Sequence, residues 1–193
     1  MGRGRSSGSS VLRIIGGEWR GRKIAFPQHP DLRPTGDRVR ETLFNWLAPQ
    51  LAGARCLDLF AGSGILGIEA LSRGAAHCDF FDNHPETARN ISQQLANLGA
   101  GSRASVQCSD ALALLAQGAA PWDIIFIDPP FDSALGEPSL RALALHGSLH
   151  QTSWVYLETR RSQPAGVPEE KYAVFREKTA GDVRFQLLQL HTT

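Results

Sequence analysis

The sequence predicts an α/β fold in which a mostly parallel β-sheet is covered by helices on both faces. From residue 55 onward, short apolar segments alternate with segments of helical periodicity, as in strand–helix–strand units. The apolar segments are nearly continuous, as is typical of strands that are buried on both faces. A glycine-rich turn joins the first of these strands to the helix that follows. The 193 residues suffice for one such domain, alone or with a small appendage.

The N-terminal part is expected to be separate from this alternation. Residues 1–10 are rich in Gly, Ser and Arg, and we expect them to form a disordered tail. Val11–Ile15 and Lys23–Phe26 are strand-like runs around a Gly- and Arg-rich turn, which predicts a β-hairpin with a basic tip or edge. Residues 11–50 are therefore interpreted as an extension, and residues 51–193 as the main domain.

A helix is predicted to follow the hairpin and to run to about Leu47. Either Thr35 or Asp37 is expected to cap its first turn, because both side chains accept backbone hydrogen bonds well. Apolar residues recur at helical spacing and define one face: Val39, Leu43, Trp46 and Leu47. Charged residues are expected off that face: Arg38, Arg40 and Glu41.

The elements of the main domain follow in order. Strands are predicted at Arg55–Phe60, His77–Phe81, Ala104–Cys108, Trp122–Ile127, Ser153–Leu157, Tyr172–Glu177 and Val183–Leu190. Helices are predicted at Gly64–Arg73, from Pro85 to just before Gly99, at Asp110–Ala116 and near Leu135–His146. The last two strands have no helix between them, so we expect an antiparallel hairpin at one sheet edge. Ligands of such sheets bind beyond the carboxyl ends of the strands.

Charge is unevenly distributed along the chain, although the net charge is only +1. Residues 1–46 hold nine Lys and Arg against four Asp and Glu, whereas the rest of the chain holds eleven against fifteen. A basic arm on a mildly acidic body indicates a polyanionic partner, and nucleic acid is the candidate. The alternative is a solvated surface without such a partner.

Composition and cysteine usage predict a globular protein in a reducing compartment, without a membrane span. The hydrophobic share of 42% and the charged share of 20% are ordinary for a globular protein. No apolar run reaches the roughly 18 residues of a membrane span, and the N-terminus lacks the apolar stretch of a secretory signal. Cys56, Cys78 and Cys108 form no CxxC pair, so we expect buried free thiols, no metal site, and a reducing compartment, the cytoplasm.

The first candidate site is a glycine-rich turn flanked by acids. Residues 62–67 form a GxGxxG pattern between a predicted strand and helix, which in that context is a nucleotide-binding signal. Asp82 ends the next strand and is placed to accept the ribose hydroxyls of an adenosine, and Asp110 could accept the adenine amine. Asp58 precedes the turn, where a carboxylate would repel a pyrophosphate but would suit an ammonium and a sulfonium. We therefore predict S-adenosylmethionine as the cofactor and S-adenosylhomocysteine as the product.

The second candidate site, Asp128-Pro129-Pro130-Phe131, ends the strongest predicted strand. The two prolines remove two N–H donors and fix φ, and Pro129 holds Asp128 in an extended conformation. The result is a stiff ledge that carries a carboxylate and a carbonyl, followed by an apolar plate. A strand-ending turn without catalytic function is the alternative. The position opposite the first site favours catalysis.

A planar exocyclic amine explains these residue types. Its lone pair is delocalised into the ring, so the nitrogen attacks poorly. Hydrogen bonds from its N–H groups to Asp128 and a proline carbonyl would favour a pyramidal nitrogen, whose lone pair could displace the sulfonium methyl group in line. Phe131 would stack on the base, which is worth about 1–3 kcal/mol. A base in such a pocket has been unstacked or flipped out of its strand.

These motifs resemble those of class I S-adenosylmethionine-dependent methyltransferases that act on amino nitrogens. Two N-terminal stretches, Arg13–Lys23 and Leu32–Leu47, are similar to the RsmD family, and the resemblance runs from about Val11 to Leu190. It implies a seven-stranded, Rossmann-like methyltransferase domain with an N-terminal β-hairpin that helps to hold RNA. It also implies methylation of a guanine N2 in bacterial 16S rRNA, with the assembled small-subunit particle as the expected substrate. We further expect a monomer without a membrane partner.

The resemblance also implies roles for individual residues. Cofactor contacts are expected from Asp58, Phe60, Ala61, Gly62, Gly64, Asp82, Asn83, Asp110, Ala111, Thr35, Arg40 and Thr42. The target guanine is expected to be held by Asp128, Pro129, Pro130 and Phe131. RNA phosphates are expected to be bound by Arg20, Arg22, Lys23, Arg33 and Arg38, each of which could instead form a surface ion pair. One departure concerns Asp82, which stands where the family usually has Glu and reaches the ribose less directly.

Three other functions share parts of this pattern. A DNA adenine-N6 or cytosine-N4 methyltransferase would use both candidate sites, but a separate target-recognition domain is not evident in this length. A nicotinamide-dependent oxidoreductase would use the GxGxxG turn and would not need Asp128. A non-catalytic RNA-binding module would retain the fold without the reaction.

Overall fold

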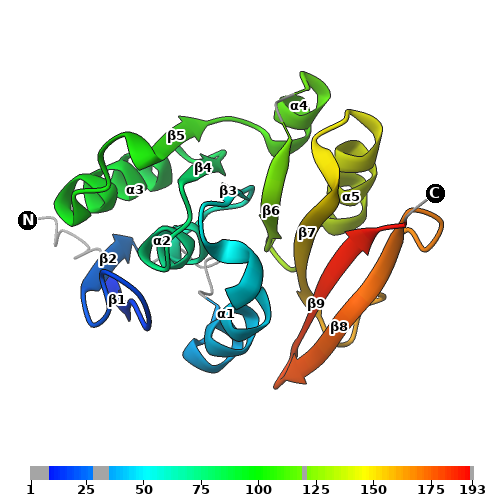
Figure 1. Ribbon diagram of the computed structural model, residues 1–193, viewed down its shortest axis with the longest axis horizontal. Coiled ribbons are helices and arrows are strands. Elements are labelled where there is room, and N and C mark those ends of the chain that lie inside the picture. Colours follow the sequence, from blue (N-terminus) through cyan, green and yellow to red (C-terminus); the bar gives the residue numbers. More distant parts are fainter. Residues whose placement is uncertain (1–8, 28–34, 119–120, 192–193) are drawn as a thin grey trace, which may run out of the picture.

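A seven-stranded sheet forms the centre of the computed structural model, which describes residues 9–27, 35–118 and 121–191 (Figure 1). Its strands lie in the order β5-β4-β3-β6-β7-β9-β8, and a separate two-stranded sheet pairs β1 with β2. The strands are β1 Ser9–Arg13, β2 Lys23–Pro27, β3 Arg55–Asp58, β4 His77–Asp82, β5 Ala104–Cys108, β6 Trp122–Ile127, β7 Leu149–Arg160, β8 Tyr172–Ala180 and β9 Val183–Leu190. The helices are α1 Asp37–Leu51, α2 Ile65–Ser72, α3 Pro85–Leu98, the 3-10 turn η1 Gly101–Arg103, α4 Ala111–Ala116 and α5 Gly136–Leu145. The predicted α/β fold is confirmed.

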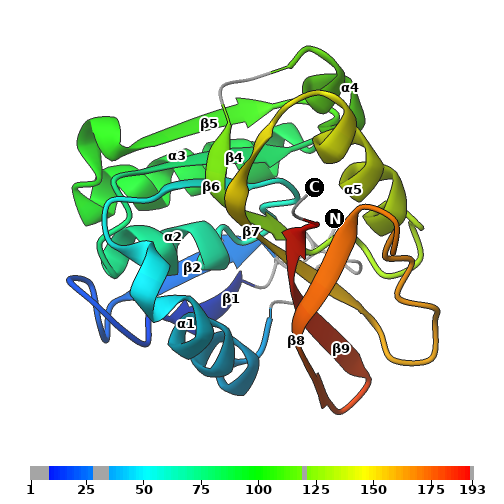
Figure 2. The ribbon, with the colours of Figure 1, turned by 45° about the vertical axis from the view of Figure 1, so that its right-hand side comes forward.

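The central parallel strands are buried on both faces because alternate residues enter two different cores. In β6, Ile124 and Phe126 pack on the side of α1, α2 and α3, whereas Ile125 and Ile127 pack on the side of α4 and α5. Figure 2 shows α4 and α5 together on their side of the sheet. This two-sided burial explains why residues 124–127 of β6 form an uninterrupted apolar run in the sequence.

Strand order places a crevice where ligands of such sheets bind. β3 is central, and its parallel neighbours are β4 on one side and β6 on the other. The chain runs outward from β3 through β4 to β5, then returns to β6 on the opposite side of β3. The loops after β3 and β6 therefore diverge at the carboxyl ends of the strands and leave space between them.

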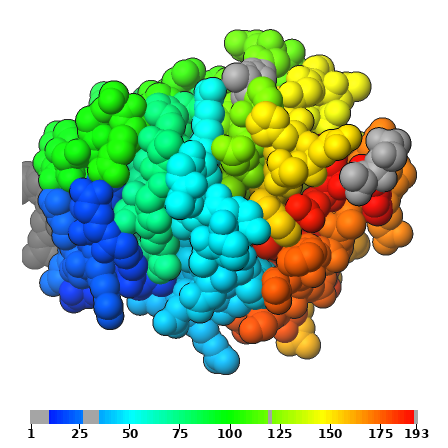
Figure 3. All heavy atoms as spheres, in the orientation of Figure 1, coloured from blue at the N-terminus to red at the C-terminus, as the bar shows by residue number. Residues whose placement is uncertain are grey.

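The two ends of the molecule carry the two hairpins. The predicted N-terminal hairpin is present as β1–β2, and the predicted edge hairpin as β8–β9. Figure 3 shows the N-terminal hairpin (blue) and the β8–β9 hairpin (orange and red) separated by α1 (cyan).

Several predicted boundaries differ from the structure. β1 begins at Ser9, because Ser9 and Ser10 pair with the end of β2, so the predicted tail of residues 1–10 extends two residues too far. Residues 1–8 lie outside the described residues. β7 is longer than the predicted Ser153–Leu157, because it pairs with β6 on one side and with β9 on the other. These pairings are tertiary contacts that the local sequence does not encode.

The first helix also departs from expectation. Neither Thr35 nor Asp37 caps α1, whose N-cap is Gly36 without a side-chain hydrogen bond. The helix continues through Pro49 to Leu51, since a proline in the last turn removes a single N–H donor while Leu51 remains buried. Of the three cysteines, all free, Cys108 is exposed rather than buried.

Candidate active site

A cavity of about 220 Å³ lies at the carboxyl ends of β3, β4 and β6. It brings together most of the residues predicted for cofactor and substrate: Thr35, Asp58, Phe60, Ala61, Gly62, Asp82, Asn83, Asp110, Ala111, Asp128, Pro129, Pro130 and Phe131. The wall also includes residues that the sequence analysis did not single out: Ser63, Ile65, Leu66, His84, Thr87 and Leu135. Most of these belong to the first turns of α2 and α3 or directly precede them. Their place immediately after the strand ends is the signal that could have identified them.

The glycine-rich turn after β3 is held by two carboxylates. The Asp58 carboxylate accepts a hydrogen bond from the Gly67 N–H at 3.0 Å, and the Asp82 carboxylate accepts one from the Gly62 N–H at 2.9 Å. Gly64 is the N-cap of α2 with a φ of 74°, a left-handed conformation that favours glycine. A Cβ atom on Gly67 would lie 2.3 Å from the Phe80 ring, so glycine is needed for close packing of α2 on the sheet.

Asp58 is the most electrostatically unusual group of this turn. Asp58 is 2% exposed, and this burial raises the pKa of its carboxyl group to about 7. The hydrogen bond from Gly67 lowers the pKa, and the nearby charge of Asp82 raises it. No Lys or Arg among the described residues forms an ion pair with Asp58. A cationic ligand in the cavity would supply the missing charge and would favour the ionised carboxylate.

Two further acids stand at the ends of β4 and β5. Asp82 accepts a hydrogen bond on each carboxylate oxygen, from the N–H groups of Gly62 and His84. Asp110 caps α4 by accepting a 2.8 Å hydrogen bond from the Ala113 N–H. Each carboxylate oxygen has a second lone pair, so both side chains can still accept hydrogen bonds from a bound hydroxyl or amine.

The Asp128-Pro129-Pro130-Phe131 ledge also lines the cavity. Asp128 follows β6, and its Oδ2 accepts a 2.9 Å hydrogen bond from the Thr35 hydroxyl. Burial and the negative charge of Glu158 raise the pKa of Asp128 well above its ordinary value, and the bond from Thr35 opposes that rise. Glu158 itself is buried and accepts a 2.7 Å hydrogen bond from the Tyr156 hydroxyl. An N–H donor that enters the cavity would therefore stabilise the ionised form of Asp128.

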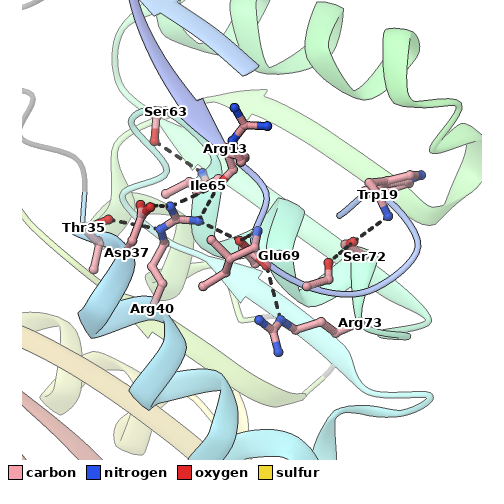
Figure 4. A network of polar contacts seen from close by, with 12 residues as sticks. Arg13, Trp19, Thr35, Asp37, Arg40, Ser63, Ile65, Glu69, Ser72 and Arg73 are labelled. Atoms are coloured by element: carbon pink, nitrogen blue, oxygen red, sulfur yellow. Dashed lines mark hydrogen bonds and ion pairs between the residues drawn. The ribbon is translucent and has the colours of Figure 1, made fainter. Parts of the chain in front are cut away.

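Thr35 is positioned by a buried ion pair that the sequence analysis did not anticipate (Figure 4). The Arg40 Nε donates to the Thr35 carbonyl at 3.2 Å, and its Nη1 donates to Glu69 at 2.6 Å. The same guanidinium donates to the Arg13 carbonyl at the end of β1. Glu69 also accepts the Ile15 N–H. Arg40 therefore joins the hairpin, α1 and α2, and its side chain is 0% exposed rather than off the buried face.

The structure does not bring every predicted site residue to the cavity. Arg40 and Gly64 are not part of its wall, and neither is Thr42, whose hydroxyl donates to the Arg38 carbonyl. Arg40 acts at one remove, through the Thr35 carbonyl. Gly64 contributes through the shape of the turn.

The residues predicted to bind RNA lie on or near the N-terminal extension. Arg20, Lys23 and Arg38 are exposed. The Arg22 guanidinium donates to backbone carbonyls at the C-terminus of α3, so it contributes to docking of the hairpin. Arg33 lies outside the described residues. Exposed cations on one extension fit a phosphate-binding role.

Residues 9–27, 35–118 and 121–191 contain no helix with the length and apolar character that a bilayer crossing requires. They also contain no cluster of three or more His, Cys, Asp or Glu side chains arranged to hold a metal ion.

Comparison with known proteins identifies close relatives. The family described as Conserved hypothetical protein 95 matches residues 12–189. The ribosomal RNA small subunit methyltransferase D of Escherichia coli K12 is 46% identical over 183 residues, which covers 95% of this chain and 92% of the relative. The protein of the same name from Haemophilus influenzae is 41% identical over 181 residues, which covers 92% of this chain and 93% of the relative.

Solved structures show the same architecture. An Escherichia coli protein described as a candidate methyltransferase superposes with a TM-score of 0.83 at 44% identity, which covers 94% of this chain and 98% of that one. A Haemophilus influenzae protein described as a candidate methylase gives a TM-score of 0.80 at 38% identity, which covers 94% and 99% of the two chains.

Proposed function

The chain belongs to the RsmD family, described as Conserved hypothetical protein 95, and from this premise we propose that it transfers a methyl group from S-adenosylmethionine to a guanine N2 of 16S rRNA. The observation that carries the proposal is that Asp58 and Asp128 line one cavity, close enough for the charge of Asp58 to raise the pKa of Asp128. The curated relatives are named as small-subunit ribosomal RNA methyltransferases. The choice of guanine N2 and of the small ribosomal subunit as partner is our inference.

The residues on the Asp58 wall fit a methyl donor with a cationic end. S-adenosylmethionine, when bound, supplies an electrophilic methyl group on a sulfonium. Asp58 has a raised pKa and lacks a cationic partner among the described side chains, so a ligand ammonium would stabilise its ionised form. Asp82 and Asp110 retain acceptor capacity for ribose hydroxyls and an adenine amine. The apolar part of the wall, including Phe60 and Leu66, would contact the adenine ring.

The residues of the Asp128-Pro129-Pro130-Phe131 ledge fit a purine with an exocyclic amine. Asp128 would accept an N–H of that amine, which holds the nitrogen lone pair toward the methyl donor. The prolines exclude competing backbone N–H donors from the ledge, and Phe131 would stack on the flipped base. Because the pKa of Asp128 is raised, this carboxylate is placed to accept the proton that the nitrogen loses after methylation. Holding both reactants in line contributes up to roughly 7–11 kcal/mol.

The position of Asp58 favours S-adenosylmethionine over a dinucleotide as the cofactor. Asp58 points into the turn where a dinucleotide would place its pyrophosphate, and a carboxylate there is unfavourable for an anion.

We also propose that residues 11–50 help to hold RNA and shape the cavity, and that the protein acts as a cytoplasmic monomer. The buried free thiols of Cys56 and Cys78 fit a reducing compartment.

Methyl transfer from labelled S-adenosylmethionine tests this function. The substrates are small-subunit particles and naked 16S rRNA from cells that lack the protein, and duplex DNA. We expect label in ribosomal RNA, at a guanine N2. Asp128→Asn should reduce transfer by at least about a hundredfold, since an oriented acceptor in the reacting complex is worth about 3 kcal/mol, while RNA binding is retained. Glu169→Gln, a carboxylate-to-amide change at an exposed position, is the matched control.

Other outcomes identify the alternatives. Label in DNA alone would establish a DNA amino methyltransferase. Calorimetric binding of NADH without binding of S-adenosylhomocysteine would establish a nicotinamide enzyme. Full activity of Asp128→Asn would remove Asp128 from the reaction.

A further inference from the structure

A second hollow adjoins the proposed substrate cavity and shares one wall with it. It measures about 450 Å³ and is lined by Phe131, Arg160, Arg161, Ser162 and Asp182, here called the basic groove. Phe131 belongs to both hollows. A nucleotide stacked on Phe131 in the cavity would therefore have its neighbours along the strand beside the basic groove.

The two arginines of the groove are available to an anion. The Arg160 guanidinium lies over the Phe131 ring, 5.6 Å from its centroid, and pairs with Asp132 at 3.4 Å. Asp132 is 87% exposed, so this ion pair is weak and exchangeable. The Arg161 guanidinium has no hydrogen bond or ion pair with any residue in the described parts of the chain. The positive charge of Arg161 is thus unpaired within the described residues.

The backbone that carries these arginines is held firmly. The Arg161 N–H donates to the Asp182 carbonyl at 2.7 Å. From β9, the Arg184 guanidinium donates to the carbonyls of Arg161 and Gln163 at 3.2 and 3.0 Å. The turn after β7 is therefore tied to the start of β9. Arg184 adds a third positive charge beside the groove, against the two carboxylates of Asp132 and Asp182.

We propose that the basic groove binds the phosphate backbone of the RNA strand directly next to the methylated guanine. This inference rests on the proposed function and extends it by assigning a subsite for the flanking nucleotide. Flipping a base out of its stack costs unstacking energy. Contacts that hold the flanking backbone would help to offset this cost. Guanidinium groups bind phosphate oxygens in a bidentate geometry, and a serine hydroxyl such as that of Ser162 adds a further donor. The groove is lined by the turn after β7 and the residue before β9, whereas the basic hairpin is formed by β1 and β2, so the two would hold separate parts of the RNA.

The test compares RNA affinity across salt concentrations for charge-neutralised variants. Arg161→Gln is the main variant, because the Arg161 side chain forms no hydrogen bond or ion pair in the described parts of the chain whose loss would unfold the protein. Arg160→Gln is the second variant. Arg141→Gln, on α5, is the matched control, since it removes the same charge at a similarly exposed position outside the groove. The readout is the dissociation constant of the protein saturated with S-adenosylhomocysteine for a 16S rRNA fragment.

We expect Arg161→Gln to weaken RNA binding by several fold at low salt and to reduce the slope of log affinity against log salt by about one. Arg160→Gln should have the same effect, and Arg141→Gln should leave the slope unchanged. An unchanged slope for both groove variants overturns the proposal. A reduced turnover of Arg160→Gln with an unchanged slope also overturns it, because Arg160 would then only support Phe131.

Wild-type protein, assayed for methylation of the same fragment, separates this proposal from the proposed function. Methylation by the wild type with unchanged slopes in both groove variants refutes the groove alone. Binding of the fragment without methylation of either the fragment or small-subunit particles by the wild type refutes the proposed function, and the slopes still decide whether the groove contacts phosphate.

Discussion

Replacing Asp58 by Asn is expected to make the protein more stable and less able to bind its methyl donor. The carboxyl is buried, and its pKa is raised from 3.8 to about 7 in the folded protein. The folded state therefore holds this proton more tightly than the unfolded chain does. Ionising Asp58 costs folding free energy, and that cost is absent below about pH 4 and complete above about pH 7.

The magnitude follows from the size of the shift. About three pH units, at 1.36 kcal/mol per unit, correspond to on the order of 4 kcal/mol at pH 8. Asn removes the charge and keeps an oxygen that can accept the Gly67 N–H. For a chain of this length, that gain corresponds to a rise in Tm of roughly 10 °C. Loss of a charge-assisted contact to a ligand ammonium, about 1.5–3 kcal/mol, should weaken donor binding by roughly 10- to 150-fold.

Two assays check these expectations on the same protein. Urea unfolding at pH 4 and pH 8 measures the free energy of unfolding of wild type and Asp58→Asn, and the difference should appear at pH 8 and vanish at pH 4. Titration calorimetry with S-adenosylhomocysteine should show that wild-type affinity falls about tenfold per pH unit below pH 7, whereas the Asn variant is insensitive to pH in that range. Glu169→Gln controls for removal of an exposed carboxylate.

Two results would refute this reasoning. A variant that is less stable than wild type at pH 8 would mean that Asp58 stabilises the fold as an anion. Donor affinity that follows the same pH curve in both proteins would mean that another group carries the titration.

Two further variants test the Asp128-Pro129-Pro130-Phe131 ledge and its support. Thr35→Val removes a hydroxyl that opposes the raised pKa of Asp128; a hydrogen bond to a charged group is worth about 1.5–3 kcal/mol, so the acidic limb of kcat/KM should move about one to two units to higher pH. Thr35→Ser should restore the limb, and an unshifted limb in Thr35→Val would show that Asp128 does not govern it. Arg40→Met leaves Glu69 buried without its main partner and should lower the free energy of unfolding by about 3–5 kcal/mol in urea titrations; a loss below about 1 kcal/mol would contradict the role of this ion pair.

The sequence was sufficient for the elements that depend on local pattern. The apolar run of β6 and the periodicity of α3 predict the bounds of these elements almost residue for residue. Burial on both faces gives a continuous apolar run, and burial on one face gives apolar residues at helical spacing. The boundaries of β1 and β7 were predicted less well, because their ends are set by hydrogen bonds to strands that are distant in the chain.

The candidate site was predictable where its residues follow strand ends. Asp58, Asp82, Asp110 and Asp128 each stand directly at or after a parallel strand, and parallel strands bring their carboxyl ends to one edge. The buried state of Arg40 was not predictable, because a charged residue in a polar-looking segment is normally exposed. Its partner Glu69 lies 29 residues away, on α2.

The chain's order of residues alone thus determined the fold class, the four acidic strand ends and the stiff proline ledge, since these depend on neighbours along the chain. Tertiary structure alone decided that the pKa values of Asp58 and Asp128 are raised, because desolvation depends on everything packed around a carboxyl group. It also decided that Thr35 bonds to Asp128 rather than capping α1, and that a basic groove adjoins Phe131. Those contacts join segments that are distant in the chain, and no local pattern records them.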